Sequence, residues 1–171
     1  MADEIQKVYY ILQYFRRRSR KNSENLSYTK CGTSGGDFVV IRILIADDYL
    51  PFRQVLKDFL ETANPRLKVV VQASNGRDAL NLLEKNPVDV ALIDIRMPIM
   101  DGMELCRLIR KGWGQHIGII TYTGLNSPRL TAQALQTGAD LHFVKPFELF
   151  SLASAVIKLG DSRKVAAVSV G

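Results

Sequence analysis

The chain has 171 residues, of which 47% are hydrophobic and 23% charged, so it is long enough for one full-sized domain with its own core. No apolar run approaches the roughly 18 residues of a membrane span, and no signal-peptide pattern opens the sequence. The two cysteines, Cys31 and Cys106, lie far apart in segments of different character and are expected to be reduced thiols. These features predict a cytoplasmic protein.

The first 38 residues carry half of the net charge of +6, with seven Lys and Arg against four Asp and Glu. Their basic cluster consists of Arg16, Arg17, Arg18, Arg20 and Lys21. Such a cluster attracts phosphate backbones or anionic lipid, although a solvated arm is the commoner meaning of a charge run. We expect residues 1–38 to form a basic N-terminal extension whose second half, rich in Ser, Asn, Thr and Gly, is a flexible linker.

From residue 39 onward, short apolar runs alternate five times with amphipathic segments. The predicted strands cover residues 39–46, 67–72, 88–94, 117–121 and 141–144. The predicted helices lie between and after them, at 49–62, 76–86, 102–111, 128–137 and 147–158. Strands that are apolar throughout indicate a parallel sheet buried on both faces, and right-handed crossovers then give a doubly wound α/β fold. The predicted domain covers 39–159, followed by a short C-terminal tail at 160–171.

Two of the predicted helices have clear start signals. Asp101 can cap the helix at 102–111, with Glu104 as its capping-box partner. Pro128 suits the first position of the next helix, behind Ser127. These signals place the loops that precede both helices at the carboxyl ends of strands.

Polar side chains follow or end four of the five predicted strands. They are Asp47 and Asp48 after the first strand, Asp94 at the end of the third, Thr123 after the fourth and Lys145 after the fifth. Because ligands of doubly wound sheets gather beyond the carboxyl ends of the strands, we expect these side chains at one rim. Three carboxylates within about 4–6 Å repel one another by several kcal/mol, and Mg²⁺, which prefers oxygen ligands, would remove that conflict.

The same set of residues can support phosphoryl transfer. A cation and Lys145 would supply positive charge where a phosphoryl group places its equatorial oxygens. A carboxylate in line with that group can attack it and form an acyl phosphate. Thr123 can donate a hydrogen bond to the same oxygens, and Gly124 leaves room for them. Each residue alone has an ordinary explanation as a cap, a turn or a surface residue; their order and their common place at strand ends carry the prediction.

Three segments resemble the receiver domains of bacterial response regulators: ILIADD ending at Asp48, DIRMPIMDGMEL beginning at Asp94, and KPF beginning at Lys145. The match runs in order from about residue 39 to residue 159. The stretch IRILIADDYLPFR, from Ile41, looks most similar to the receivers of LuxR/NarL-type transcription regulators. This resemblance implies a flavodoxin-like (βα)5 fold with strand order 2-1-3-4-5.

By the same resemblance, Asp94 is the phosphoacceptor and takes phosphate from a sensor histidine kinase or a histidine phosphotransfer protein. The implied Mg²⁺ ligands are Asp47, Asp48, Asp94 and the main-chain carbonyl of Arg96. The domain would catalyse its own Mg²⁺-dependent phosphorylation and dephosphorylation, but its purpose would be regulatory rather than enzymatic.

The resemblance also assigns the residues that respond to the phosphate. Thr123 matches the switch hydroxyl and Lys145 the phosphate-pairing lysine, with a cis peptide bond before Pro146. His142 departs from the pattern, since the family carries Tyr or Phe three residues before the lysine. An imidazole could still act as the rotamer switch and couple it to pH, and a partly exposed strand-edge histidine is the equally supported alternative. Arg96, together with Leu125, could shield the acyl phosphate from water, so Arg96→Ala is expected to change its half-life.

Two kinds of output remain open. In a stand-alone receiver, phosphorylation would switch a protein-binding face formed by the fourth helix, fifth strand and fifth helix, at about 127–159, through which phosphorylation-dependent dimers form in the family. In the alternative, the chain is the receiver half of a LuxR/NarL-type DNA-binding regulator that lacks its effector domain here, since the residues after 160 are too few for a helix-turn-helix. In a variant of this alternative the basic N-terminal arm itself binds nucleic acid, which is not expected of the receiver.

Two further classes do not fit the sequence. Haloacid-dehalogenase-type phosphatases need an Asp-x-Asp motif after the first strand, whereas Asp47 and Asp48 are adjacent. A Rossmann-type nucleotide site needs Gly-x-Gly-x-x-Gly at the same place, where acidic residues stand instead.

Overall fold

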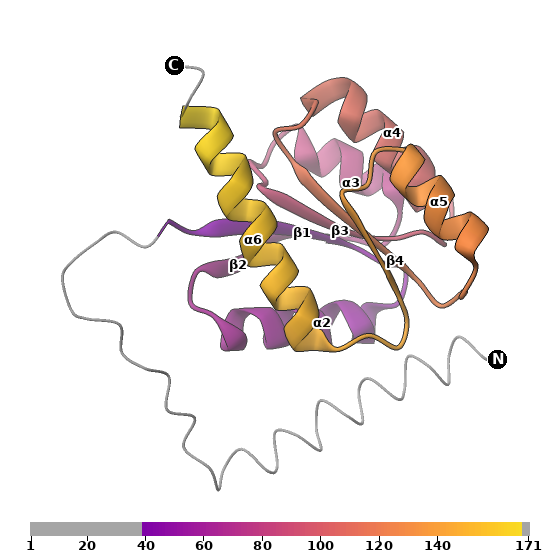
Figure 1. The fold of residues 1–171 in the computed structure, drawn as a ribbon, viewed down its shortest axis with the longest axis horizontal. Coiled ribbons are helices and arrows are strands. Elements are labelled where there is room, and N and C mark those ends of the chain that lie inside the picture. Colours follow the sequence, from indigo (N-terminus) through magenta and orange to yellow (C-terminus); the bar gives the residue numbers. More distant parts are fainter. Residues whose placement is uncertain (1–38, 169–171) are drawn as a thin grey trace, which may run out of the picture.

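The computed structural model describes residues 39–168. Five parallel strands form one sheet in the order β2-β1-β3-β4-β5, which confirms the predicted doubly wound topology (Figure 1). The strands are β1 (Ile41–Ala46), β2 (Leu67–Ala73), β3 (Val90–Asp94), β4 (Gly118–Thr123) and β5 (Leu141–Val144). The helices are α2 (Leu50–Ala63), α3 (Gly76–Leu83), α4 (Gly102–Trp113), α5 (Pro128–Gln136) and α6 (Leu149–Val168). The predicted extension at 1–38 and the residues after 168 lie outside the described part.

The sheet has a core on each face because both faces of its central strands are covered by helices. Alternate residues of β1 show this: Ile43 and Ile45 pack with α2 and α6, whereas Leu44 and Ala46 pack with α3 and α4. All five residues of β3 are buried. The apolar runs of the sequence therefore reflect burial on both sides, as predicted.

The predicted cap residues of α4 and α5 are in place. The Asp101 carboxylate accepts a hydrogen bond from the main-chain nitrogen of Glu104 at 2.8 Å, and so caps α4. Ser127 caps α5, which Pro128 opens. Both helices therefore begin directly after loops that border the carboxyl ends of β3 and β4.

Helix α6 is longer than the predicted helix at 147–158, because it continues to Val168. Three charged side chains in the second half of α6 pair with residues just before the amino ends of β2, β3 and β5. Arg163 pairs with Asp140, Lys164 Nζ lies 3.5 Å from Asp89, and Asp161 pairs with Arg66. The predicted boundary at 159 thus falls inside a continuous helix, and residues 160–168 are helical rather than a separate tail.

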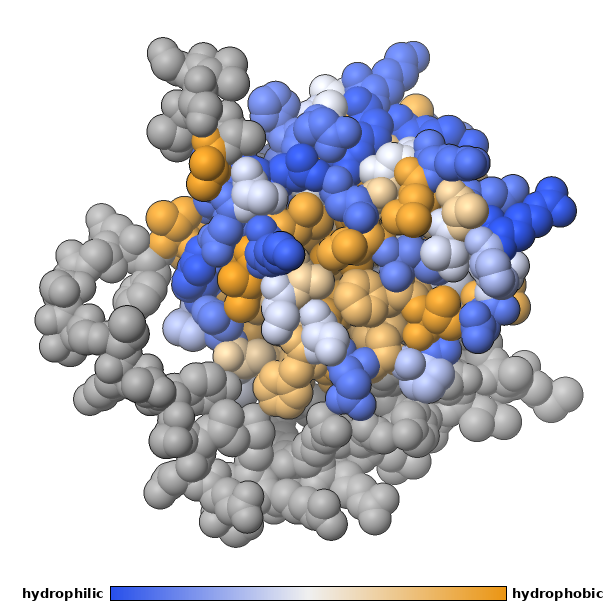
Figure 2. Space-filling view, in the orientation of Figure 1, coloured by the Kyte–Doolittle hydropathy of each residue, from blue (hydrophilic) through white to orange (hydrophobic). Residues whose placement is uncertain are grey.

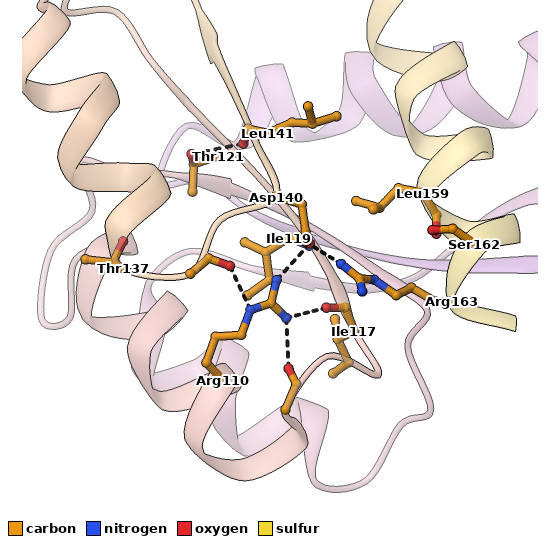
Figure 3. A network of polar contacts seen from close by, with 12 residues as sticks. Arg110, Ile117, Ile119, Thr121, Thr137, Asp140, Leu141, Leu159, Ser162 and Arg163 are labelled. Atoms are coloured by element: carbon orange, nitrogen blue, oxygen red, sulfur yellow. Dashed lines mark hydrogen bonds and ion pairs between the residues drawn. The ribbon is translucent and has the colours of Figure 1, made fainter. Parts of the chain in front are cut away.

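The Asp140 carboxylate joins α6 to α4 (Figure 3). Its oxygens pair with Arg163 of α6 and, at 2.7 Å, with Arg110 of α4, and one also accepts the main-chain hydrogen of Ile119. Arg110 additionally donates to the carbonyls of Gly138, Gly114 and Ile117. Because nearly every donor and acceptor of this network is used, it fixes the loops at the amino ends of the strands.

No helix within residues 39–168 is both long and apolar enough to cross a membrane.

Candidate functional site

The carboxyl ends of β1 and β3 lie side by side and bring the predicted acidic residues together. Ala46 pairs with Ile93, so the next residue of each strand, Asp47 and Asp94, lies at the same rim. Both are buried, with exposed fractions of 0% and 4%, whereas Asp48 is exposed. One carboxylate oxygen from each of the three lies within 4.8 Å of the others. The sequence prediction that these side chains share one rim is therefore correct in geometry.

Lys145, directly after β5, completes the cluster. Its Nζ lies 3.1 Å from Asp47 Oδ2 and 3.1 Å from Asp94 Oδ2, and the lysine is 3% exposed. Its main-chain nitrogen donates to the carbonyl of Thr123 at 2.8 Å, which anchors the lysine to β4. The peptide bond between Lys145 and Pro146 is cis, as predicted.

The charges of this buried cluster do not balance. Burial raises the pKa of Asp94 to about 6, Lys145 opposes that shift, and the neighbouring Asp47 adds to it. One ammonium group thus serves two buried carboxylates, with Asp48 beside them. A further cation would stabilise such a buried cluster of oxygen atoms, because the cluster carries a net negative charge.

Two aromatic rings lie under the lysine, and the sequence prediction did not include either. Lys145 Nζ is 4.4 Å from the ring centroid of Phe52 and 4.6 Å from that of Tyr122, distances at which a cation is attracted to a ring face. The two rings meet edge to face at 5.8 Å. Phe52 lies on the buried side of α2, and Tyr122 is the aromatic residue of the otherwise aliphatic and threonine-rich β4. The sequence feature that could have identified Tyr122 as part of the site is its position directly before Thr123.

Thr123 and His142, the two predicted switch residues, do not contact each other through any hydrogen bond of the described chain. Thr123 is buried, and its hydroxyl accepts from the main-chain nitrogen of Leu125 at 3.3 Å. His142 Nδ1 instead lies 2.9 Å from the hydroxyl of Thr121. Its Nε2 is buried without a partner among the described residues, and burial lowers the pKa of His142. The imidazole is therefore neutral at pH 7 in this conformation.

Arg96 is exposed, and its main-chain nitrogen donates to Asp94 Oδ1 at 3.2 Å. This contact turns the acceptor carboxylate toward the loop after β3. The role of the Arg96 carbonyl as a metal ligand stays a prediction, as does the shielding by Arg96 and Leu125.

The donor set fits a small divalent cation. Its candidate side-chain ligands are all carboxylate oxygens, which Mg²⁺ prefers, and one of the three aspartates is exposed, which leaves a side open to the waters that Mg²⁺ retains. The uncompensated negative charge around Asp94 would be neutralised by such an ion. Asp47, Asp48 and Asp94 are thus suited to hold it.

Comparison with known proteins identifies a family whose members resemble this chain. Residues 43–157 match the family model of the response regulator receiver domain. A DNA-binding response regulator of the LuxR family from Staphylococcus aureus has a similar structure, with a TM-score of 0.66 and 25% identity over 71% of this chain and 99% of that one.

Curated relatives are longer proteins. Response regulator MprA of Mycolicibacterium vanbaalenii is 33% identical over 66% of this chain and 47% of its own length. A protein-glutamate methylesterase/protein-glutamine glutaminase of Methanosarcina mazei is 34% identical over 77% of this chain and 35% of its own length. The matched part of this chain spans less than half the length of these relatives.

Proposed function

The chain belongs to the response regulator receiver domain family, and from this premise we propose that it is a phosphorelay switch whose phosphoacceptor is Asp94. The observation that carries the proposal is the position of Lys145 Nζ, 3.1 Å from the carboxylates of both Asp47 and Asp94. A buried ammonium group beside a nucleophilic carboxylate is suited to the transfer of a dianionic phosphoryl group, whose charge it offsets.

In the proposed step, a carboxylate oxygen of Asp94 attacks the phosphorus of a phosphohistidine on a histidine kinase or phosphotransfer protein. The O–P bond forms as the P–N bond breaks, and the histidine nitrogen takes a proton. Asp94 thereby becomes a mixed anhydride, an acyl phosphate. Attack by water on phosphorus later returns the carboxylate and inorganic phosphate.

The residues around Asp94 have separate roles in this proposal. A bound Mg²⁺ would neutralise charge on the phosphoryl oxygens, held by Asp47, Asp48 and Asp94. Lys145 would leave the Asp47 carboxylate and pair with a phosphoryl oxygen. Thr123 would turn its hydroxyl from the loop toward the phosphoryl group, and that reorientation would report the phosphate to β4 and α5.

The proposed output is a protein partner that binds the face formed by α5, β5 and α6. Apolar side chains gather on the surface between α5 and α6 (Figure 2). Leu135, Leu141 and Phe150 are exposed at 46%, 40% and 39%, one on each of the three elements. Patches of this kind mark interaction sites. Cytoplasmic location and a regulatory rather than enzymatic purpose belong to the same proposal.

A second candidate is the receiver half of a DNA-binding regulator, favoured by the similarity to the LuxR-family structure. In that case the same face would control an attached effector domain. Whether the reading frame continues past Gly171 discriminates the two. The methylesterase relatives make an attached enzymatic domain a third outcome of that inspection.

The test is intact-mass spectrometry after incubation with acetyl phosphate and Mg²⁺. We expect one phosphoryl adduct on the wild type and on the control variant Asp58→Asn, which changes an aspartate of α2 whose carboxylate contacts Gln54 instead of the site. Asp94→Asn should show no adduct. An adduct that survives in Asp94→Asn would contradict the proposal.

A further inference from the structure

Tyr122 is a fully buried polar residue of the site that the phosphoryl-transfer scheme leaves without a role. Its side chain has no exposed surface, and its hydroxyl makes no hydrogen bond of good geometry with any described residue, although it lies near enough to Asp47 for that carboxylate to raise its pKa as an acceptor. A buried hydroxyl without a partner costs free energy that a phenylalanine at the same place would not. The presence of a tyrosine here would be explained if its hydroxyl made a hydrogen bond in a second state of the site.

The hydroxyl lies close to the acidic cluster. Tyr122 pairs across the sheet with Asp94, and its ring lies beneath Lys145. Burial raises the pKa of Tyr122 well above its usual value, Asp47 and Asp94 raise it further, and Arg53 lowers it. Among these groups Asp47 is the acceptor toward which a phenol proton would be drawn most strongly.

The Asp47 carboxylate would need a new hydrogen-bond donor if Lys145 moved away from it. Its Oδ1 accepts from the main-chain nitrogen of Tyr49 at 2.8 Å, and its Oδ2 from Lys145 Nζ at 3.1 Å. In the proposed phosphorylation, Lys145 turns to the phosphoryl group and Asp47 loses that hydrogen bond. A buried carboxylate that loses a donor needs a replacement, or it swings away from its position.

We propose that the Tyr122 hydroxyl positions Asp47 for cation binding, by donating a hydrogen bond to its carboxylate when Lys145 pairs with the phosphoryl group. Tyr122 is thus a positioning residue that acts through Asp47. The inference rests on the proposed function, because it gives Lys145 two alternative partners. Phe52, the other ring under the lysine, has no hydroxyl and cannot take this part.

The test is calorimetric titration of Mg²⁺, in the presence of beryllium fluoride as a stand-in for the phosphoryl group on Asp94, into the wild type and Tyr122→Phe, a variant that keeps the ring and removes only the hydroxyl. Partners behind the ligands of a metal typically change its affinity by 10–100-fold, so we expect Mg²⁺ to bind Tyr122→Phe about tenfold more weakly. The thermal midpoint in EDTA should be unchanged or higher, because an unpaired buried hydroxyl has been removed. Equal Mg²⁺ affinity in the two proteins would overturn the inference, and so would weaker binding that accompanies a lower midpoint in EDTA.

Tyr49→Phe is the matched control, since it removes the same group from the half-buried ring that follows the acidic pair. It should leave Mg²⁺ affinity close to the wild-type value. With acetyl phosphate as donor, the initial rate of Tyr122→Phe should fall at low Mg²⁺ and return to the wild-type rate at saturating Mg²⁺. A wild type that takes no phosphate on Asp94 would refute the proposed function. Phosphorylation of Asp94 with equal Mg²⁺ affinity in Tyr122→Phe would refute the role of Tyr122 alone.

Discussion

Lys145 Nζ lies 3.1 Å from Asp94 Oδ2, and the two side chains are only 0% and 5% exposed. A second carboxylate, that of Asp47, is equally close to the same ammonium group. Little water reaches these charges, so their interactions are weakly screened. The protein groups of this site therefore form a buried cluster with more negative than positive charge, and the stability of the protein should respond to charge changes there in a defined direction.

Removing the ammonium should destabilise the metal-free protein. In Lys145→Met the two buried carboxylates lose the ammonium group that pairs with both, and breaking a buried pair from one side costs about 3–5 kcal/mol. We expect urea unfolding in EDTA to show a loss of about 3 kcal/mol in unfolding free energy. Mg²⁺ should then raise the thermal midpoint of the variant more than that of the wild type, because it supplies the missing positive charge. An equal rise in both proteins would contradict this view.

Removing the charge of Asp94 should do the opposite. Since burial raises the pKa of Asp94 to about 6, its protonated form favours the folded state, and this contribution is present below about pH 4 and lost as the pH rises through 6. Asp94→Asn keeps the neutral state at every pH. At pH 7.5 in EDTA it should be more stable than the wild type by about 1–3 kcal/mol.

That advantage of Asp94→Asn should shrink at pH 4.5, where the wild-type carboxyl is itself protonated. The measurement is urea unfolding of both proteins at the two pH values. A difference in unfolding free energy that is the same at pH 4.5 and pH 7.5 would show that the charge of Asp94 is not the cause.

The loop after β3 holds a strained residue beside the site. Ile99 has a φ of 68°, which side chains branched at Cβ rarely adopt, and its side chain is 81% exposed. Ile99→Gly should raise the unfolding free energy by about 0.5–1 kcal/mol, because relief of the left-handed strain exceeds the entropy cost of glycine. Ile99→Val, which keeps the branch, should have no such effect. Equal stability of all three proteins would exclude strain at this position.

The second half of α6 packs closely on the sheet through Gly160. A Cβ there would lie 2.8 Å from Ile41 Cγ2 and 2.9 Å from its Cδ1. Gly160→Ala should therefore lower the unfolding free energy by about 1–3 kcal/mol. Gly112→Ala in α4 is the matched control, since nothing lies within 4 Å of its Cβ, and it should stabilise by about 0.5–1 kcal/mol. A neutral Gly160→Ala would mean that α6 does not pack on β1 as described.

The sequence predicted the fold and the acidic cluster because both depend on short-range patterns. Apolar runs without alternation indicate buried parallel strands, and the rule that such strands end at one rim places Asp47, Asp94 and Lys145 together. All five strands are present, although β3 begins at Val90 instead of residue 88 and β4 extends to Thr123. Such shifts are expected where a strand runs into its loop.

The features that escaped prediction depend on contacts between distant segments. The length of α6 is set by pairs such as Arg163 with Asp140, whose partners are far apart in the chain. Tyr122 had no predicted role, because only the fold reveals that its ring lies under Lys145. The partner of His142 is Thr121 because the register of β4 and β5 sets these two opposite each other.

The most direct test of the central claim is to locate the acyl phosphate itself. Borohydride reduces an aspartyl phosphate to homoserine, so protein phosphorylated with acetyl phosphate and Mg²⁺ should, after reduction and digestion, carry homoserine at position 94 and aspartate at positions 47 and 48. Homoserine at another position, or a phosphoryl adduct that resists borohydride, would contradict the assignment of Asp94 as the phosphoacceptor.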